Sequence, residues 1–108
     1  MLWDRALLVL STWAVTYADW GKTSEAQALH REIVARAARE YAPRTFLAMS
    51  AAAAGEQDLA IALARQAEEA REPVFLALAR NFPGFRRVRE DPRFPDILRR
   101  LKLPGIDD

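Results

Sequence analysis

Cysteine is absent from this chain, which excludes disulfides, thiolate chemistry and cysteine-based zinc sites. Glycine occurs only 4 times and histidine once. Runs of Val, Ile and Thr are also missing, whereas alanine is frequent; this balance favours helix over sheet. A net charge of +1 provides no general attraction to nucleic acid or to a membrane surface. We therefore expect a helical protein with no metal site and no cofactor.

The length and composition fit one folded domain. The chain has 108 residues, of which 51% are hydrophobic and 29% charged. A chain of this size can bury roughly two thirds of its unfolded surface, and its composition is globular rather than disordered.

Residues 1–20, MLWDRALLVLSTWAVTYADW, have an apolar middle like that of a secretory leader. However, Asp4 offsets Arg5, and no clear cleavage site of small residues follows. The segment is also too short and too often interrupted by polar residues to span a membrane. We expect a cytoplasmic protein with no membrane partner, and the absence of cysteine is compatible with that location.

Apolar spacing, together with the positions of proline and glycine, predicts an all-α fold. Six helices and one short helical turn are expected, followed by a frayed tail at residues 104–108. The helices are expected at residues 2–20, 23–40, 43–55, 56–71, 73–80 and from 92 or 93 to 101, with the short turn at 85–89.

Several residues recur at a spacing of 34. Gly21 and Gly55 have this offset, and a helix–glycine turn–helix unit with this period is the signature of tetratricopeptide repeats. Other pairs at the same offset are Trp13 and Leu47, Ala14 and Ala48, Ala26 and Ala60, Leu29 and Leu63, and Ile33 and Ala67.

On these residues the chain resembles the tetratricopeptide repeat family, over about residues 7–73. The motif positions are Trp13, Ala14, Tyr17, Gly21, Ala26 and Ile33 in the first unit and Leu47, Ala48, Gly55, Ala60, Ala67 and Pro73 in the second. The resemblance implies antiparallel helical hairpins stacked as a short right-handed solenoid. It divides the chain into a first hairpin (1–40), a second hairpin (41–72), an incomplete third unit with a cap (73–103) and the tail (104–108).

The segment Asp91-Pro92-Arg93-Phe94 resembles the end of many bacterial tetratricopeptide arrays, where a short helix caps the stack. Repeat stacks need such a cap with a polar outer face. The apolar residues expected to cover the end of the core are Phe94, Ile97, Leu98 and Leu101.

Gly21-Lys22-Thr23 spells the end of a phosphate-binding loop. That loop requires an earlier glycine and a preceding strand, but Thr16 stands at the glycine position, inside a predicted helix. We interpret the triplet as a turn between helices, with Thr23 or Ser24 as the N-cap of the next helix.

No catalytic residue is predicted. His30, the one histidine, falls on the inward side of its helix and is expected to be a partly buried packing residue, because no nucleophile or ligand set accompanies it. The adjacent carboxylates Glu68-Glu69 and Asp107-Asp108 are expected to be solvated.

The last third is locally basic and gives the alternative function, a nucleic-acid-binding helical domain. A solvated helical exterior is favoured over this alternative because the whole chain is nearly neutral. Phe82, Phe85 and Phe94 are expected to seal the core rather than to stack on bases.

The resemblance implies a concave groove lined by the first helix of each hairpin. Its lining would be small and apolar, which suits a helix or an apolar peptide; the alternatives are that the chain's own cap or an identical subunit fills it. The expected lining residues are Ser11, Val15, Ala18, Thr45, Met49, Ala52, Ala53 and Arg80.

The first helix offers a second contact surface, because Leu8, Val15 and Trp20 are expected to point outward, and large apolar patches mark interfaces. Either upstream repeats of a longer chain or a second copy would cover it, and Leu8 and Trp20 are the interface candidates. Together these features predict a non-catalytic protein–protein interaction scaffold that binds a protein or peptide, with a homo-oligomer as one form.

Overall fold

The regular structure of residues 2–101, the part that the computed structural model describes, is entirely helical, as the sequence predicts. Side chains are described for residues 6–99, so the expected tail at 104–108, the Asp107-Asp108 pair and the side chain of Leu101 lie outside the described residues. The elements are α1 (Leu2–Asp19), α2 (Thr23–Ala37), α3 (Arg44–Ala53), α4 (Gln57–Glu69), α5 (Pro73–Leu78), the 3-10 helix η1 (Pro83–Phe85), α6 (Arg86–Arg89) and α7 (Phe94–Leu101).

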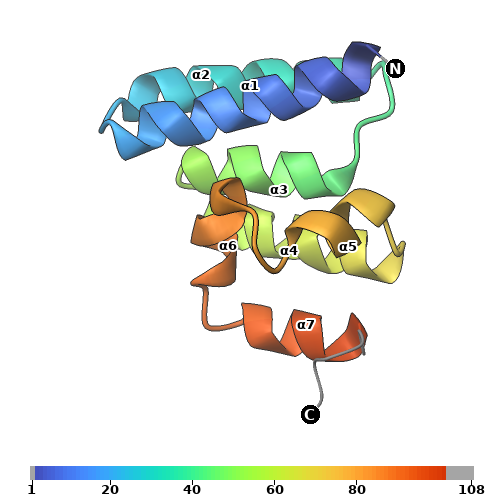
Figure 1. The fold of residues 1–108 in the computed structure, drawn as a ribbon. Coiled ribbons are helices and arrows are strands. Elements are labelled where there is room, and N and C mark those ends of the chain that lie inside the picture. The colour runs from blue at the N-terminus through green and yellow to red at the C-terminus, as the bar shows by residue number, and fades with distance from the viewer. Residues whose placement is uncertain (1, 102–108) are drawn as a thin grey trace.

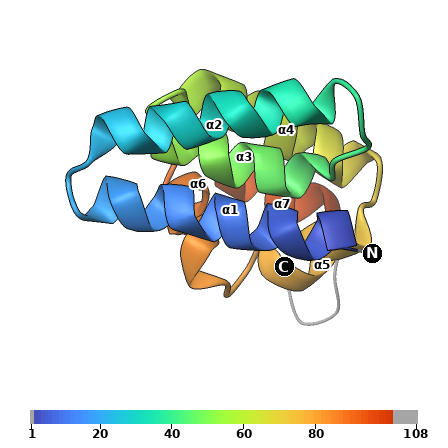
Figure 2. The same cartoon turned by 90° about the horizontal axis from the view of Figure 1, so that it is seen from above.

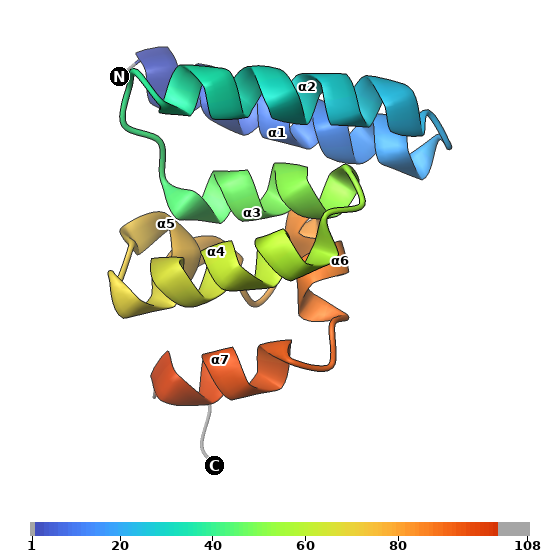
Figure 3. The same cartoon turned by 180° about the vertical axis from the view of Figure 1, so that it is seen from behind.

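The helices are stacked in layers (Figures 1 and 3). The antiparallel pair α1 and α2 forms one outer layer, α3 and α4 lie beneath it with α5 and α6, and α7 lies at the opposite end. Seen from above, α3 runs beneath the α1–α2 pair (Figure 2). Helix α3 packs against α1, α2 and α4, whereas α7 packs against α4 and α6.

The turns that follow α1 and α3 are equivalent in backbone conformation and in hydrogen bonding. Gly21 and Gly55 have positive φ values of 79° and 86°. The Gly21 amide donates to the Ala18 carbonyl (3.0 Å) and the Gly55 amide to that of Ala52 (3.1 Å). The amide after each glycine makes a second hydrogen bond: Lys22 donates to the Tyr17 carbonyl and Glu56 to the Ala51 carbonyl, both at 2.8 Å. Glycine occupies both turns because a Cβ disfavours this left-handed backbone.

The second helix of each hairpin begins in the same way. Lys22 and Glu56 precede α2 and α4 with φ, ψ of −94°, 68° and −91°, 68°, and neither supplies a side-chain cap. The expectation that Thr23 or Ser24 caps α2 is therefore wrong: the glycine turn places Lys22 at the cap position and Thr23 inside the helix. A third turn of this kind ends α4, where Arg71 has φ 54°.

Small side chains allow the helices to approach closely. Ala14, Ala26, Ala48 and Ala60 are completely buried, and they occupy the same positions in the two hairpins. Below them Phe75, Phe85 and Phe94 form an edge-to-face cluster with ring centroids 5.8–6.3 Å apart, a favoured geometry for buried aromatic rings. Phe85 and Phe94 thus seal the core, as expected, while Phe82 is half-buried.

Candidate protein-interaction site

The side chains assigned to the concave groove lie mostly in the core. Ala18 is half-buried and Arg80 is exposed, but the others are inaccessible to a partner in this conformation. Those buried are Ser11, Val15, Thr45, Met49, Ala52 and Ala53. Ser11 is further engaged through its Oγ, which donates to the Phe46 carbonyl at 3.4 Å.

The chain itself fills the place of the groove. Helix α6 packs against α3, and η1 packs against α1. At Gly84, a Cβ would lie only 2.7 Å from the Met49 Cε atom, so the backbone of this segment lies directly on the Met49 side chain. Arg87 then reaches the end of α1, where its guanidinium lies 2.8 Å from the Asp19 carboxylate. The segment that packs on these residues is η1 and α6, whereas the expected cap helix, α7, packs against α4 and α6.

A group of accessible apolar side chains lies on the other side of α1. Trp13 and Trp20 are 55% and 68% exposed, and together with Thr16 and Tyr17 they line a hollow of about 160 Å³. These four residues have the spacing i, i+3, i+4, i+7, so they face one way along about 10 Å of helix. Val9, 49% exposed, extends the same stripe by one turn. We call the four lining residues the α1 aromatic face.

Only one of the two expected interface residues belongs to this face. Trp20 lines the hollow, whereas Leu8 lies about 120° from Trp20 around the helix axis, given 3.6 residues per turn. The third residue expected to point outward, Val15, is buried. Sequence reasoning assigned Trp13 and Tyr17 to the repeat motif and not to a surface. The signal that could have identified them is their alignment with Trp20.

His30 is a packing histidine. It is 6% exposed, and its Nδ1 atom shares a hydrogen bond with the Oγ atom of Ser50 in α3 at 2.7 Å. Burial lowers the pKa of the His30 imidazole below its ordinary value; Glu56 acts in the opposite direction and Arg31 lowers the pKa further. Ser50 is completely buried, so this pair joins two helices and offers no nucleophile to a substrate. Sequence reasoning had not identified Ser50 as its partner.

Pro43, at the N-cap position of α3, makes no side-chain hydrogen bond to the helix, and Glu72 caps the first turn instead. Its buried carboxylate accepts hydrogen bonds from the Arg44 amide (2.9 Å), the Thr45 amide (3.1 Å) and the Thr45 hydroxyl (2.8 Å). A carboxylate at a helix N-terminus satisfies unpaired amides and the positive end of the helix dipole. Of the carboxylates expected to be solvated, Glu69 is exposed but Glu68 is buried, because Glu68 lies beside Ala67 on the inner side of α4.

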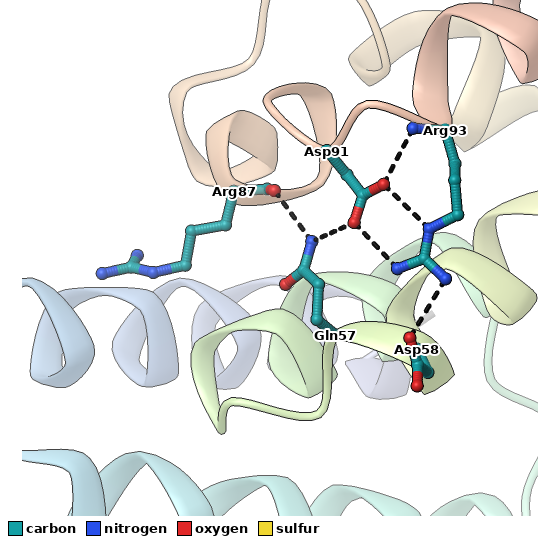
Figure 4. A network of polar contacts seen from close by, with 5 residues as sticks. All are labelled: Gln57, Asp58, Arg87, Asp91 and Arg93. Carbon is teal, nitrogen blue, oxygen red and sulfur yellow. Dashed lines mark hydrogen bonds and ion pairs between the residues drawn. The ribbon is translucent and has the colours of Figure 1, made fainter.

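The Asp-Pro-Arg-Phe segment holds the last helix through a polar network (Figure 4). The Arg93 guanidinium donates to both Asp91 oxygens at 2.9 Å, and Gln57 of α4 donates to Asp91 at 3.1 Å and to the Arg87 carbonyl at 3.2 Å. Arg93 also reaches Asp58 at 3.0 Å. The hydrogen bonds from Arg93 hold the pKa of the Asp91 carboxyl well below its ordinary range, although burial opposes them.

The arginines of the basic last third are largely engaged within the chain. Arg86 and Arg87 pair with Asp19, and Arg99 pairs with Asp96. Arg89 donates to the carbonyls of Ala79 and Phe82. Because these guanidinium groups already have acceptors, this surface offers less free positive charge to phosphates than the sequence indicates.

Other kinds of site find little support in the described part of the chain. Residues 2–19 before Gly21 are helical, so Gly21-Lys22-Thr23 does not follow a strand as a phosphate-binding loop would. No group of three His, Asp or Glu residues with described positions could hold a metal ion. Among the described helices, none has the length and apolar character needed to cross a membrane.

No protein-family model, no curated protein and no solved structure matches the chain.

Proposed function

We propose that this chain is a non-catalytic protein–protein interaction module whose contact surface is the α1 aromatic face. The observation that carries the proposal is the hollow bounded by Trp13, Thr16, Tyr17 and Trp20. Tryptophan and tyrosine dominate the energetically important positions of protein interfaces, and apolar patches on a protein surface mark binding sites.

The proposal includes a tetratricopeptide-like arrangement of the hairpins. Its support is the equivalence of the turns at Gly21 and Gly55 and the packing of α3 against both helices of the preceding hairpin. Such stacks are scaffolds in which each unit covers its neighbour. The proposed setting is the cytoplasm.

A peptide selection tests the proposed surface. Phage-displayed 15-residue peptides are panned against the whole protein and then compared on a Trp13→Ala/Trp20→Ala variant. A Val34→Ala/Leu59→Ala variant is the matched control, since both residues are exposed and apolar but lie on other helices. Alanine maintains helix propensity, and circular dichroism checks that each variant is folded.

We expect selected peptides to bind the wild-type protein and the control equally, and to bind the tryptophan variant at least tenfold more weakly, which corresponds to about 1.4 kcal/mol. If no peptides are enriched, or if the enriched peptides bind all three proteins alike, the α1 aromatic face is not the contact surface.

A further inference from the structure

The α1 aromatic face has a counterpart inside the molecule. Adding the 34-residue period to its four residues gives Leu47, Ser50, Ala51 and Ala54 on the α3 segment. The two sets are comparable because the turns that follow them have the same conformation and the same hydrogen bonds. The contact made by this face of α3 is therefore a guide to a contact at the face of α1.

Helix α2 covers the counterpart face. The Nδ1 atom of His30 lies 2.7 Å from the Ser50 Oγ atom, and one turn earlier Gln27 donates to the Ala54 carbonyl at 3.3 Å. Ser50, Ala51 and Ala54 are buried in consequence. Figures 1 and 3 show α2 running antiparallel to α3 across this contact.

We infer that the α1 aromatic face binds an amphipathic α-helix of another polypeptide, which lies antiparallel across α1 as α2 lies across α3. This inference rests on the proposed function and specifies its partner. In helix packing, one side chain inserts into a hole formed by four residues of the facing helix. Trp13, Thr16, Tyr17 and Trp20 form such a hole on α1.

The size and chemistry of the hole define the inserted side chain. A cavity of roughly 150 Å³ with apolar walls accepts a benzene-sized group, and the hollow on α1 has about 160 Å³. Where α2 presents His30 to the Ser50 hydroxyl, the partner helix presents a leucine, methionine or phenylalanine to the indole and phenol rings. The Thr16 hydroxyl is already engaged, because it donates to the Thr12 carbonyl at 3.0 Å.

The probe that tests this inference is a stapled peptide with the sequence of residues 23–37 and the substitution His30→Leu. The staple joins positions 28 and 32, which are exposed in α2 and lie on the side opposite His30. A second peptide carries His30→Asp. The target is the whole protein, with Trp13→Ala as the test variant and Val34→Ala as the matched control. Binding is followed through the NMR signals of the indole N–H groups.

We expect saturable binding of the His30→Leu peptide that shifts the indole signals of Trp13 and Trp20. The affinity should fall at least tenfold with the His30→Asp peptide or with Trp13→Ala, and should be unchanged with Val34→Ala. If the affinity is the same for the His30→Leu and His30→Asp peptides, or the same for the wild-type protein and Trp13→Ala, the inference is wrong.

Two further outcomes separate this inference from the proposed function. If the peptide selection gives tryptophan-dependent ligands while the stapled helix fails to bind, the face is a contact surface but its partner is not a helix in the register of α2. If sedimentation shows a dimer that dissociates in Trp13→Ala, a second copy occupies the face, and the inferred separate partner is wrong.

Discussion

Replacing either turn glycine by alanine should destabilise the protein by the same amount. An added Cβ has no heavy atom within 4 Å at Gly21 or at Gly55, so steric collision does not contribute at either position. What remains is the left-handed backbone, at φ 79° and 86°, which costs an L-residue roughly 1–2 kcal/mol. Alanine also restricts the unfolded chain, which offsets roughly 0.4–1 kcal/mol. The expected net loss is about 1 kcal/mol for each variant.

Arg71 provides a control of opposite sign. It has φ 54° at the end of α4, so Arg71→Gly should remove a similar backbone cost and raise the free energy of unfolding by roughly 0.5 kcal/mol, after the greater freedom of glycine in the unfolded chain is subtracted. Urea unfolding followed by circular dichroism at 222 nm measures all three variants. A loss of 1 kcal/mol corresponds to about 4–8 °C in Tm for a domain of this size.

Unequal losses at the two glycines would refute the reasoning. If Gly55→Ala costs nothing while Gly21→Ala costs 1 kcal/mol or more, the turns are not equivalent, and the comparison between the faces of α1 and α3 loses its basis. If Arg71→Gly destabilises the protein, an interaction of the Arg71 side chain outweighs its backbone conformation.

Three other predictions concern the buried polar groups. Burial lowers the pKa of His30 in the folded protein. Below about pH 6.5, the His30 imidazole is therefore protonated to a greater extent in the unfolded chain than in the folded one. The free energy of unfolding should therefore fall as pH decreases from 7.5 toward 5.5, by at most about 1.4 kcal/mol per pH unit, and His30→Gln should abolish this slope, because the chain has no other histidine. Asp91→Asn should destabilise the protein by about 1.5–3 kcal/mol in urea unfolding at pH 7. Because the pKa of Asp91 is depressed, the difference in free energy of unfolding between the wild type and this variant should shrink only below about pH 4. If that difference is already lost at pH 6, the ion pair between Asp91 and Arg93 does not stabilise the protein. Glu72→Gln should cost about 1 kcal/mol and increase amide hydrogen exchange at Arg44 and Thr45, while an unchanged exchange rate would show that the carboxylate does not cap α3.

Much of the fold follows from the sequence, because the helices are signalled locally. Their order and the glycine turns were predicted, and most helix ends fall within a few residues of the expected positions. The cap of α2 was not predicted correctly, since the glycine turn and not a side chain fixes where that helix begins. The cap of α3 comes from Glu72, 28 residues after Arg44, and such a non-local contact leaves no periodic signal.

The site was harder to predict because periodicity identifies an apolar stripe but not the element that covers it. Ser11, Thr45 and Met49 were expected to line a groove open to a partner, but all three are buried, and the segment around Gly84 lies on the Met49 side chain. The exposed side of α1 could have been identified by comparing the residues of the two units at equivalent positions. Tyr17 and Trp20 stand where the second unit has Ala51 and Ala54.

The large side chains at these positions of α1 determine how strongly the α1 aromatic face can bind. An aromatic side chain buries roughly 200 Å², and Trp13 and Trp20 are 55% and 68% exposed, so covering both removes roughly 250 Å² from water, equivalent to ~6 kcal/mol. Association itself costs at least about 4 kcal/mol. Covering these two side chains alone therefore leaves a net gain of at most about 2 kcal/mol, which corresponds to a Kd of roughly 30 mM. A millimolar or tighter complex requires further buried apolar area, from the partner helix itself and from contacts beyond the hole, of which the neighbouring Val9 is the first available on α1.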